Sequence, residues 1–272
     1  MKYSLAVVGW LLVSVGWTQT LTVGARSAGL GHASVALRDA GAVFSNISGV
    51  AHVKRSSLWA GYENRFGFSE GLHAVAVGFI QPTRFGTGSL SVYRFGDALY
   101  SHHRLSLGLS HRINQFSVGV RVSEHQYHIE GFDTRFRTVV DVGGQAQLSS
   151  QVILGMQLLN ITQASLSSEH HETIPTLVQV GLSYRPVTSW LLSAEVEHEV
   201  TQRPNVKLGV EYTALQKFSL RTGFNSVDLR QFFGLGWKHR LLIVNYALSV
   251  HTHLGLSHQV ALTYRLFRKG DE

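Results

Sequence analysis

Apolar and polar residues alternate with a period of two through most of the chain beyond residue 55. In the run VQVGLSYR, residues 178–185, valine, leucine and tyrosine occupy every second position, with polar or small residues between them. The pattern recurs in QFSVGVRVS at 115–123, NVKLGVEYT at 205–213 and SHQVALTYRL at 257–266. Successive side chains of a strand point to opposite faces, so each run predicts a strand with one apolar and one polar face.

Such runs, separated by polar or glycine-containing turns, predict an all-β chain that closes into an antiparallel barrel of about 14 strands (12–14). No segment beyond residue 51 has a helical period. Strands of about 9–11 residues cross a bilayer when tilted, and these runs are long enough. The predicted strands are 55–66, 71–81, 87–96, 100–112, 114–128, 135–149, 151–162, 174–185, 188–199, 203–213, 217–225, 230–239, 241–250 and 254–267.

Two architectures give this alternation. A soluble barrel or sandwich buries its apolar face, whereas a membrane barrel turns that face to lipid and lines its lumen with polar or small residues. The polar faces here are rich in glycine, serine and alanine, which suit a crowded lumen. Aromatic residues also gather near the predicted strand ends, as the girdle of a membrane barrel requires. We therefore favour a transmembrane barrel, with girdle residues Tyr100, Tyr184, Trp190, Tyr212, Trp237 and Tyr264.

The first residues have the pattern of an export signal. Lys2 precedes the short apolar run 5–13, and small residues follow, so we predict a signal peptide over 1–18. The chain has no cysteine. No later run reaches the roughly 18 apolar residues of a spanning helix. We expect a multi-pass β-barrel in the outer membrane of a Gram-negative cell.

The formal net charge of +7 does not indicate nucleic acid, because lysine and arginine are dispersed singly through the strands. These cations are expected to pair with anionic lipopolysaccharide or with acidic groups of the lumen, and the expected partners of the chain are outer-membrane lipid and lipopolysaccharide.

The stretch GARSAGLGHASVALRDAGAVFSNISGVA, residues 24–51, breaks the alternation and is rich in small residues. It resembles the N-terminal signature of the PorV/PorQ family of outer-membrane proteins, which belongs to the wider FadL-like barrel group. Weaker likeness continues in the runs ILGMQLLNI, IPTLVQVGLSYRP, KLGVEYTAL and LGLSHQVALTYRL. The residues that match the opening signature are Gly24, Ala25, Arg26, Gly29, Gly31, Ala33, Val35, Ala36, Leu37, Asp39, Ala42, Val43, Phe44, Asn46, Gly49 and Ala51.

The resemblance implies that residues 19–54 form a plug inside the lumen of a barrel built from residues 55–272. Alanines would keep its helical pieces thin, and glycines would allow close approach to the wall. Asp39 is expected to cap a helix that starts at Ala40. The plug residues that we single out are Gly24, Arg26, Gly29, Gly31, Ala36, Asp39, Phe44 and Asn46.

Two departures from the family pattern bear on function. Ile47 stands where the signature has a proline, so the turn between plug and barrel is expected to differ. The longest predicted loops, about 129–134 and 163–173, are shorter than the lids of cargo-binding members.

Metal and catalytic sites find little support. The adjacent pairs His102/His103 and His170/His171 point to opposite faces of a strand, and His251 with His253 lacks a third ligand at matching spacing. Ser257 and His258 also face apart. We therefore predict no cofactor, no metal and no enzyme activity.

Alternation also places charged residues in the lumen. Glu195, Glu197 and Glu199 share a face, and Lys207 in the next strand can answer them, so we expect a polar lumenal network. The charged residues predicted to face the lumen are Arg121, Arg185, Glu195, Glu197, Lys207, Glu211, Arg221 and Arg265.

Three functions remain open. The polar inward faces favour a PorV/PorQ-type barrel, which would be an accessory component of type IX protein secretion or surface attachment and would bind secretion-system proteins or exported cargo. The alternative is a FadL-like channel for hydrophobic small molecules, which would need an apolar pocket in the lumen. A barrel enzyme that acts on lipid is the third.

Overall fold

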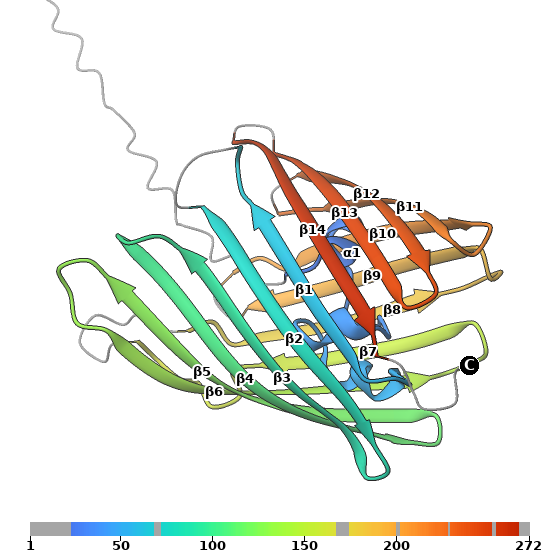
Figure 1. Cartoon of the computed structure of the whole chain (residues 1–272), viewed down its shortest axis with the longest axis horizontal. Helices are drawn as coiled ribbons and strands as arrows, with labels where there is room; N and C mark the ends of the chain where they lie inside the picture. Colours follow the sequence, from blue (N-terminus) through green and yellow to red (C-terminus); the bar gives the residue numbers. More distant parts are fainter. Residues whose placement is uncertain are drawn as a thin grey trace, which may run out of the picture.

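The computed structural model describes residues 23–67, 72–166, 174–199, 202–227, 229–251 and 254–266. The predicted signal peptide lies outside them. Within these residues fourteen antiparallel strands form a closed barrel, in which each strand pairs with its neighbours in sequence and β14 pairs with β1 (Figure 1). The strands are β1 (Ser57–Asn64), β2 (His73–Thr83), β3 (Gly86–Gly96), β4 (Tyr100–Ile113), β5 (Phe116–Ile129), β6 (Arg135–Gln147), β7 (Val152–Leu159), β8 (Leu177–Tyr184), β9 (Trp190–Glu199), β10 (Asn205–Ala214), β11 (Phe218–Asn225), β12 (Arg230–His239), β13 (Leu242–His251) and β14 (Gly255–Arg265).

Closure of the barrel leaves no free edge. The register of β1 on β14 runs from Ser57 opposite Arg265 to Asn64 opposite His258, and β1 pairs on its other side with β2. Every strand therefore has a hydrogen-bonded neighbour on both sides, which is the condition for placing strands in a bilayer. The predicted all-β barrel is confirmed.

Several strands are shorter than predicted, and β6 and β8 show the reason. β6 ends at Gln147 because the N–H groups of Leu148 and Ser149 bond to the carbonyl of Val152 and form the turn to β7. β8 begins only at Leu177, because the carbonyl of Ile174 and the hydroxyl of Thr176 bond to Asn160 instead of to a neighbouring strand.

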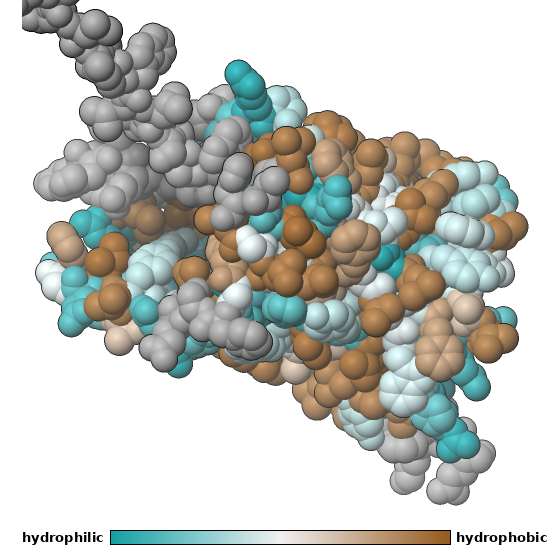
Figure 2. Space-filling view, turned by 90° about the horizontal axis from the view of Figure 1, so that it is seen from above, coloured by the Kyte–Doolittle hydropathy of each residue, from teal (hydrophilic) through white to brown (hydrophobic). Residues whose placement is uncertain are grey.

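The wall has its apolar face outside. Val180 is 41% exposed and Leu208 47%, whereas the adjacent Gln179 and Lys207 are 3% and 2% exposed and point into the lumen. Apolar residues cover much of the wall that is visible in Figure 2. A soluble barrel would have the opposite arrangement, so the exterior matches lipid and the chain is a transmembrane barrel.

The predicted girdle is also present. Trp190 and Tyr212 are paired across β9 and β10, and their rings lie 4.9 Å apart on the outer surface. Tyr184, Trp237 and Tyr264 are exposed at the same end of the barrel. Tyr100 lies at the other end, but it has the parity of the inward-facing His102 and lines a cavity in the lumen, so its assignment to the girdle is wrong. Aromatic rings at these levels fit the interfaces of the bilayer.

The two ends of the barrel differ in their connections. At one end the strands are joined by short turns, such as 84–85 between β2 and β3 and 114–115 between β4 and β5. We call this the short-turn end. The other, long-loop end carries the connections 65–72 and 160–176. Short turns face the periplasm in outer-membrane barrels, so the long-loop end faces outward. None of the helices in the described residues is long and apolar enough to span a membrane.

Residues 23–53, here called the plug, fill the middle of the lumen (Figure 1). They comprise α1 (Ala25–Gly29) and the 3-10 helices η1 (Ala40–Val43) and η2 (Ile47–His52). α1 contacts β12 and β13, whereas η2 contacts β4, β5 and β6 on the other side of the lumen.

Two local predictions about the plug had different outcomes. Asp39 precedes η1, but its side chain makes no cap hydrogen bond, so that prediction is wrong; the carboxylate binds Arg26 instead. Asn46 caps η2 by accepting a hydrogen bond from Ser48 N, and Ile47 begins this helix without a proline.

Candidate functional site

The plug is packed against glycines of the barrel wall. A Cβ atom on Gly209 would lie 2.6 Å from the carbonyl oxygen of Leu30 and 2.9 Å from its Cα. A Cβ on Gly119 would lie 2.9 Å from a methyl group of Ile47. Only glycine allows the plug backbone to approach the wall this closely. Wall glycines in contact with the plug are Gly78, Gly108, Gly119, Gly143, Gly155, Gly181, Gly209, Gly223 and Gly234.

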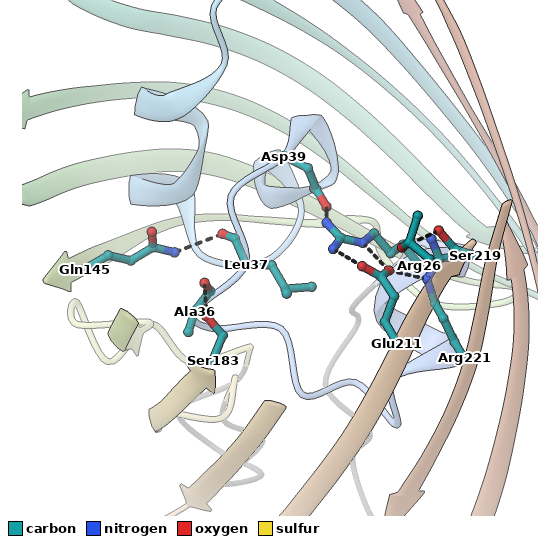
Figure 3. A network of polar contacts seen from close by, with 10 residues as sticks. Arg26, Ala36, Leu37, Asp39, Gln145, Ser183, Glu211, Ser219 and Arg221 are labelled. Atoms are coloured by element: carbon teal, nitrogen blue, oxygen red, sulfur yellow. Dashed lines mark hydrogen bonds and ion pairs between the residues drawn. The ribbon is translucent and has the colours of Figure 1, made fainter. Parts of the chain in front are cut away.

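An ion-pair network anchors the start of the plug. The Arg26 guanidinium donates to both carboxylate oxygens of Glu211, at 2.9 and 2.8 Å, and to Asp39 at 2.5 Å. Arg221 donates to the same Glu211 at 2.6 Å. Figure 3 shows Arg26 between Asp39 of the plug and Glu211 of the wall. Charge-assisted pairs of this kind are among the stronger polar contacts in proteins.

A second network holds the middle of the plug. Glu195 of β9 accepts hydrogen bonds from the backbone N–H groups of Ser34 and Val35, at 2.7 and 2.8 Å. Lys207 of β10 bonds to Glu195 at 2.9 Å and to Glu197 at 2.8 Å. The structure therefore brings together Lys207 and two members of the glutamate ladder, and adds two plug amides that the alternation did not indicate.

Arg121 of β5 and Asp141 of β6 hold the next part of the plug. Arg121 donates to Asp141 Oδ2 at 2.9 and 2.7 Å, and to the carbonyls of Val43 and Ser45 at 2.9 and 3.2 Å. The other oxygen of Asp141 accepts from the backbone N–H of Asn160 at 2.9 Å. One buried ion pair thus ties the plug, the wall and the loop after β7.

The structure places the predicted charged residues in two groups. Arg185 directly follows β8 and Arg265 ends β14, and both lie at the short-turn mouth of the lumen. The others are buried inside the barrel: Arg121, Glu195, Glu197, Lys207, Glu211 and Arg221.

The predicted plug residues lie within the plug. Asn46 is fully buried and donates to the carbonyls of Val35, Gly144 and Met156, while Phe44 packs on Trp59 with ring centroids 4.8 Å apart. Ala36 is buried, Gly24 and Gly31 have positive φ, and Gly29 contacts Gly234.

A cavity of about 290 Å³ lies between the plug and the long-loop end, and we call it the outer cavity. Phe44 and Ser45 of the plug line it on one side, and Leu166, Ile174 and Pro175 of the loop after β7 line it on another. Val139, Leu159 and Leu177 add aliphatic wall. Its size is near the lower limit of small-molecule sites.

Aromatic and imidazole rings form the remaining side of the outer cavity. His102 and Tyr127 are stacked, with centroids 4.3 Å apart and planes 3° apart. His125 lies 3.0 Å from the Nε2 atom of His102 and 3.2 Å from the Tyr127 hydroxyl. Tyr93 meets His102 edge to face. The lining of the outer cavity thus combines a flat surface of rings with an aliphatic surface.

Sequence reasoning missed this cavity, although part of its signal was present. His102 and Arg104, like His125 and Tyr127, occupy alternate positions of predicted strands, so each pair faces the lumen. The sequence pattern shows that both pairs face the lumen. It does not show that they lie side by side, because this follows from the pairing of β4 with β5, in which Arg104 is opposite His125 and His102 is opposite Tyr127.

The mouth of the outer cavity is built by ordered connections. Arg135 and Arg137 donate to backbone carbonyls of Ser165 and Leu166 and fasten the loop after β7. In the β3–β4 turn, Asp97 accepts from the N–H groups of Tyr100 and Leu99, and these bonds, that of Tyr100 above all, lower the pKa of its carboxyl. This turn positions Tyr100 at the mouth.

A second cavity of about 910 Å³ opens at the short-turn end, and we call it the inner cavity. Its lining is basic. Among the described residues its lining has two carboxylates, Asp39 and Glu211, and both are paired with Arg26. The cations in its lining are Arg26, Arg38, Lys54, Arg55, Arg185, Lys217, Arg221, Lys238 and Arg265.

Ser45 lines both cavities. The plug therefore separates them by little more than the Phe44–Ser45 segment. That segment is fixed by Arg121 and by Gln157, which donates to the Ser45 carbonyl at 3.1 Å.

The described residues contain no group of three or more histidine, aspartate or glutamate side chains placed to hold a metal ion. His102 and His103 point to opposite sides of β4, as expected. His170, His171 and His253 lie outside the described residues.

The chain was compared with known proteins. No family model and no curated protein sequence matches it. Among solved structures it is similar to the toluene transporter TodX of Pseudomonas putida, with a TM-score of 0.70 at 10% identity over 89% of this chain and 97% of that chain. It is also similar to the monoaromatic hydrocarbon channel CymD, with a TM-score of 0.69 at 11% identity over 92% and 99%.

A FadL homologue of Pseudomonas aeruginosa gives a TM-score of 0.65 at 12% identity over 90% of this chain and 99% of that chain. None of the three is described as an enzyme. At these identities the likeness shows the fold. The resemblance to PorV/PorQ in particular has no support from these comparisons and stays a prediction. The chain has the fold of a multi-pass outer-membrane β-barrel of the FadL type.

Proposed function

We propose that the chain is an outer-membrane channel that takes up hydrophobic small molecules through the outer cavity. The observation that carries this proposal is the cavity itself, which combines stacked rings and aliphatic side chains inside an otherwise polar lumen. An apolar lining with a few convergent polar groups is the usual form of a small-molecule site. The similar structures agree with it, since CymD is a monoaromatic hydrocarbon channel and TodX is a toluene transporter.

The alternation of the strands favoured a secretion-associated barrel, because the inward faces read as polar and small. Part of the apolar lining of the outer cavity comes from outside the strands, with Phe44 from the plug and Leu166 and Ile174 from the loop after β7, and the rest comes from strand residues such as Val139, Leu159 and Leu177. Phe44 and Leu166 lie outside the predicted strands, so the alternation did not show their contribution to the lumen. We find no observation that favours the secretion role over a channel.

Uptake in this account has two stages. A hydrophobic solute enters the outer cavity at the long-loop end and rests on the Phe44–Ser45 segment. It then proceeds only when that segment moves, because the plug closes the lumen between the two cavities.

Two matched variants test the proposal. Val139 of β6 is buried and lines the outer cavity, whereas its neighbour Val140 faces the other side of the same strand. Val139→Trp places an indole in the cavity, and Val140→Trp adds the same group to the outer wall. The assay is uptake of radiolabelled toluene by cells that lack their own aromatic uptake, with folding checked by heat-dependent mobility on gels.

We expect wild type and Val140→Trp to accumulate toluene above the empty-vector level, and Val139→Trp to lose most of that uptake. Equal uptake by the two tryptophan variants would remove the outer cavity from the pathway. Uptake by wild type no greater than by the vector control would refute the channel.

A further inference from the structure

One cation of the outer cavity lacks a counter-charge. Arg104 of β4 is only 7% exposed, and its side chain lines the cavity. The guanidinium lies 5.3 Å from the ring centroid of Tyr93 and 6.0 Å from that of Phe44. Within the described residues it has no carboxylate partner, and its buried Nε–H has no acceptor. Two ring faces therefore flank this charge, and the Asp141 carboxylate acts on it without an ion pair or hydrogen bond.

Four other cations inside the lumen are compensated. Arg26, Arg121, Lys207 and Arg221 each bind at least one carboxylate. Asp141 lines the outer cavity together with Arg104. One of its carboxylate oxygens accepts hydrogen bonds from Arg121, and the other accepts from the backbone N–H of Asn160. A charge removed from water without a partner is unfavourable, so this site favours a ligand that supplies an anion.

The rings beside Arg104 indicate the rest of the ligand. The stacked pair His102 and Tyr127 offers a flat face, and Val139 and Leu177 offer an aliphatic surface in the same cavity. A planar arene suits such a slot, since offset stacking and edge contacts add to the burial of its area. Arginine binds a carboxylate through two parallel N–H groups.

We propose, building on the channel function above, that the preferred ligand is a small aromatic carboxylate whose ring lies among His102, Tyr127 and Leu177 and whose carboxylate binds Arg104. The inner cavity supports this choice independently. Its described lining carries many cations, and the two carboxylates in that part of the lining are already paired with Arg26. An anion that passes the plug thus enters a region of favourable potential.

The test is calorimetric binding of three probes to the purified full chain in detergent. Benzoate is the anion, nitrobenzene is its neutral counterpart of similar shape, and toluene is the apolar reference. Arg104→Met removes the cation while keeping an unbranched apolar chain. Arg112→Met makes the same substitution in the same strand, at an exposed position of the short-turn end outside both cavities.

We expect wild type and Arg112→Met to bind benzoate about ten- to a hundredfold more tightly than nitrobenzene, the range of a charged hydrogen bond. Arg104→Met should lose that preference and keep nitrobenzene binding. A benzoate preference that survives in Arg104→Met overturns the assignment to Arg104. Wild type that prefers nitrobenzene or toluene overturns the anionic ligand and leaves the channel standing. Wild type that binds none of the three refutes the channel as well.

Discussion

Replacing Gly209 with alanine should displace the plug from the wall. Gly209 lies in the middle of β10 with its backbone against Leu30 of the plug. A Cβ there would be 2.6 Å from the Leu30 carbonyl oxygen, 2.8 Å from its Cβ and 2.9 Å from its Cα, all inside ordinary contact distance. Two of these atoms are backbone, and Leu30 is fully buried, so no flexible side chain can absorb the clash.

The magnitude follows from these contacts and from a matched control. Overpacking of a tight interface costs about 1–3 kcal/mol, and backbone against backbone places Gly209→Ala at the upper end. Gly88 of β3 is also a strand glycine, but a Cβ there meets nothing within 4 Å. Gly88→Ala should be neutral or stabilising by up to about 1 kcal/mol, because alanine restricts the unfolded chain. The two variants should therefore differ by about 2–4 kcal/mol.

Urea unfolding of the refolded barrel measures this difference, and limited trypsin digestion locates it, since the plug carries the cleavage sites Arg26 and Arg38. We expect Gly209→Ala to unfold at lower urea and to be cut within the plug, while Gly88→Ala resists. Gly78→Ala, which meets the Val43 side chain at 3.0 Å, should fall between them. If all three alanine variants unfold and digest alike, the close packing of plug and wall is wrong.

Three further outcomes are expected. Tryptophan placed at Val180 or Leu262 should be quenched by brominated lipid, and tryptophan at the adjacent Gln179 or Thr263 should not; equal quenching would contradict the inside–outside assignment. Arg121→Met should lower the free energy of unfolding by about 3–5 kcal/mol, because it leaves the Asp141 carboxylate buried without its ion-pair partner. The double variant Arg121→Met/Asp141→Leu should regain part of this free energy in urea titrations. If it regains none, the broken ion pair is not the cause of the lost stability. Glu195→Gln should expose the plug at Arg38 to trypsin, because Lys207, Ser34 N and Val35 N lose a shared carboxylate; unchanged digestion would show that this network does not anchor the plug.

The sequence predicted the barrel well because alternation is a local property. Each strand shows its period in about ten residues, and lipid outside with small polar residues inside leaves a regular pattern. Errors lay where side chains interrupt the ladder, as where Asn160 binds Ile174 and Thr176 and delays the start of β8. Asp39 was misassigned because a capping rule considers only the next few backbone groups. Its carboxylate instead binds Arg26, which lies 13 residues earlier in the chain.

The candidate site was harder to predict than the fold. Arg104, Arg121 and Arg221 all face the lumen. Nothing in the alternation shows that Arg121 and Arg221 have carboxylate partners, whereas Arg104 has none among the described residues. The outer cavity joins strand, loop and plug residues across the lumen, so it exists only once the barrel has closed around the plug. The contacts among these residues depend on the register of the strands and on the position of the plug, and the sequence pattern shows neither.

The most direct test of the account is to locate a hydrophobic ligand in the protein. Crystals of the full chain soaked in bromobenzene give an anomalous bromine signal whose position needs no assumption about the site. The account predicts a peak in the outer cavity, between the ring of Phe44 and the surface formed by Tyr127 and Leu177. A peak found only in the basic inner cavity or on the lipid-facing wall would contradict the claim that hydrophobic molecules enter this barrel through the outer cavity.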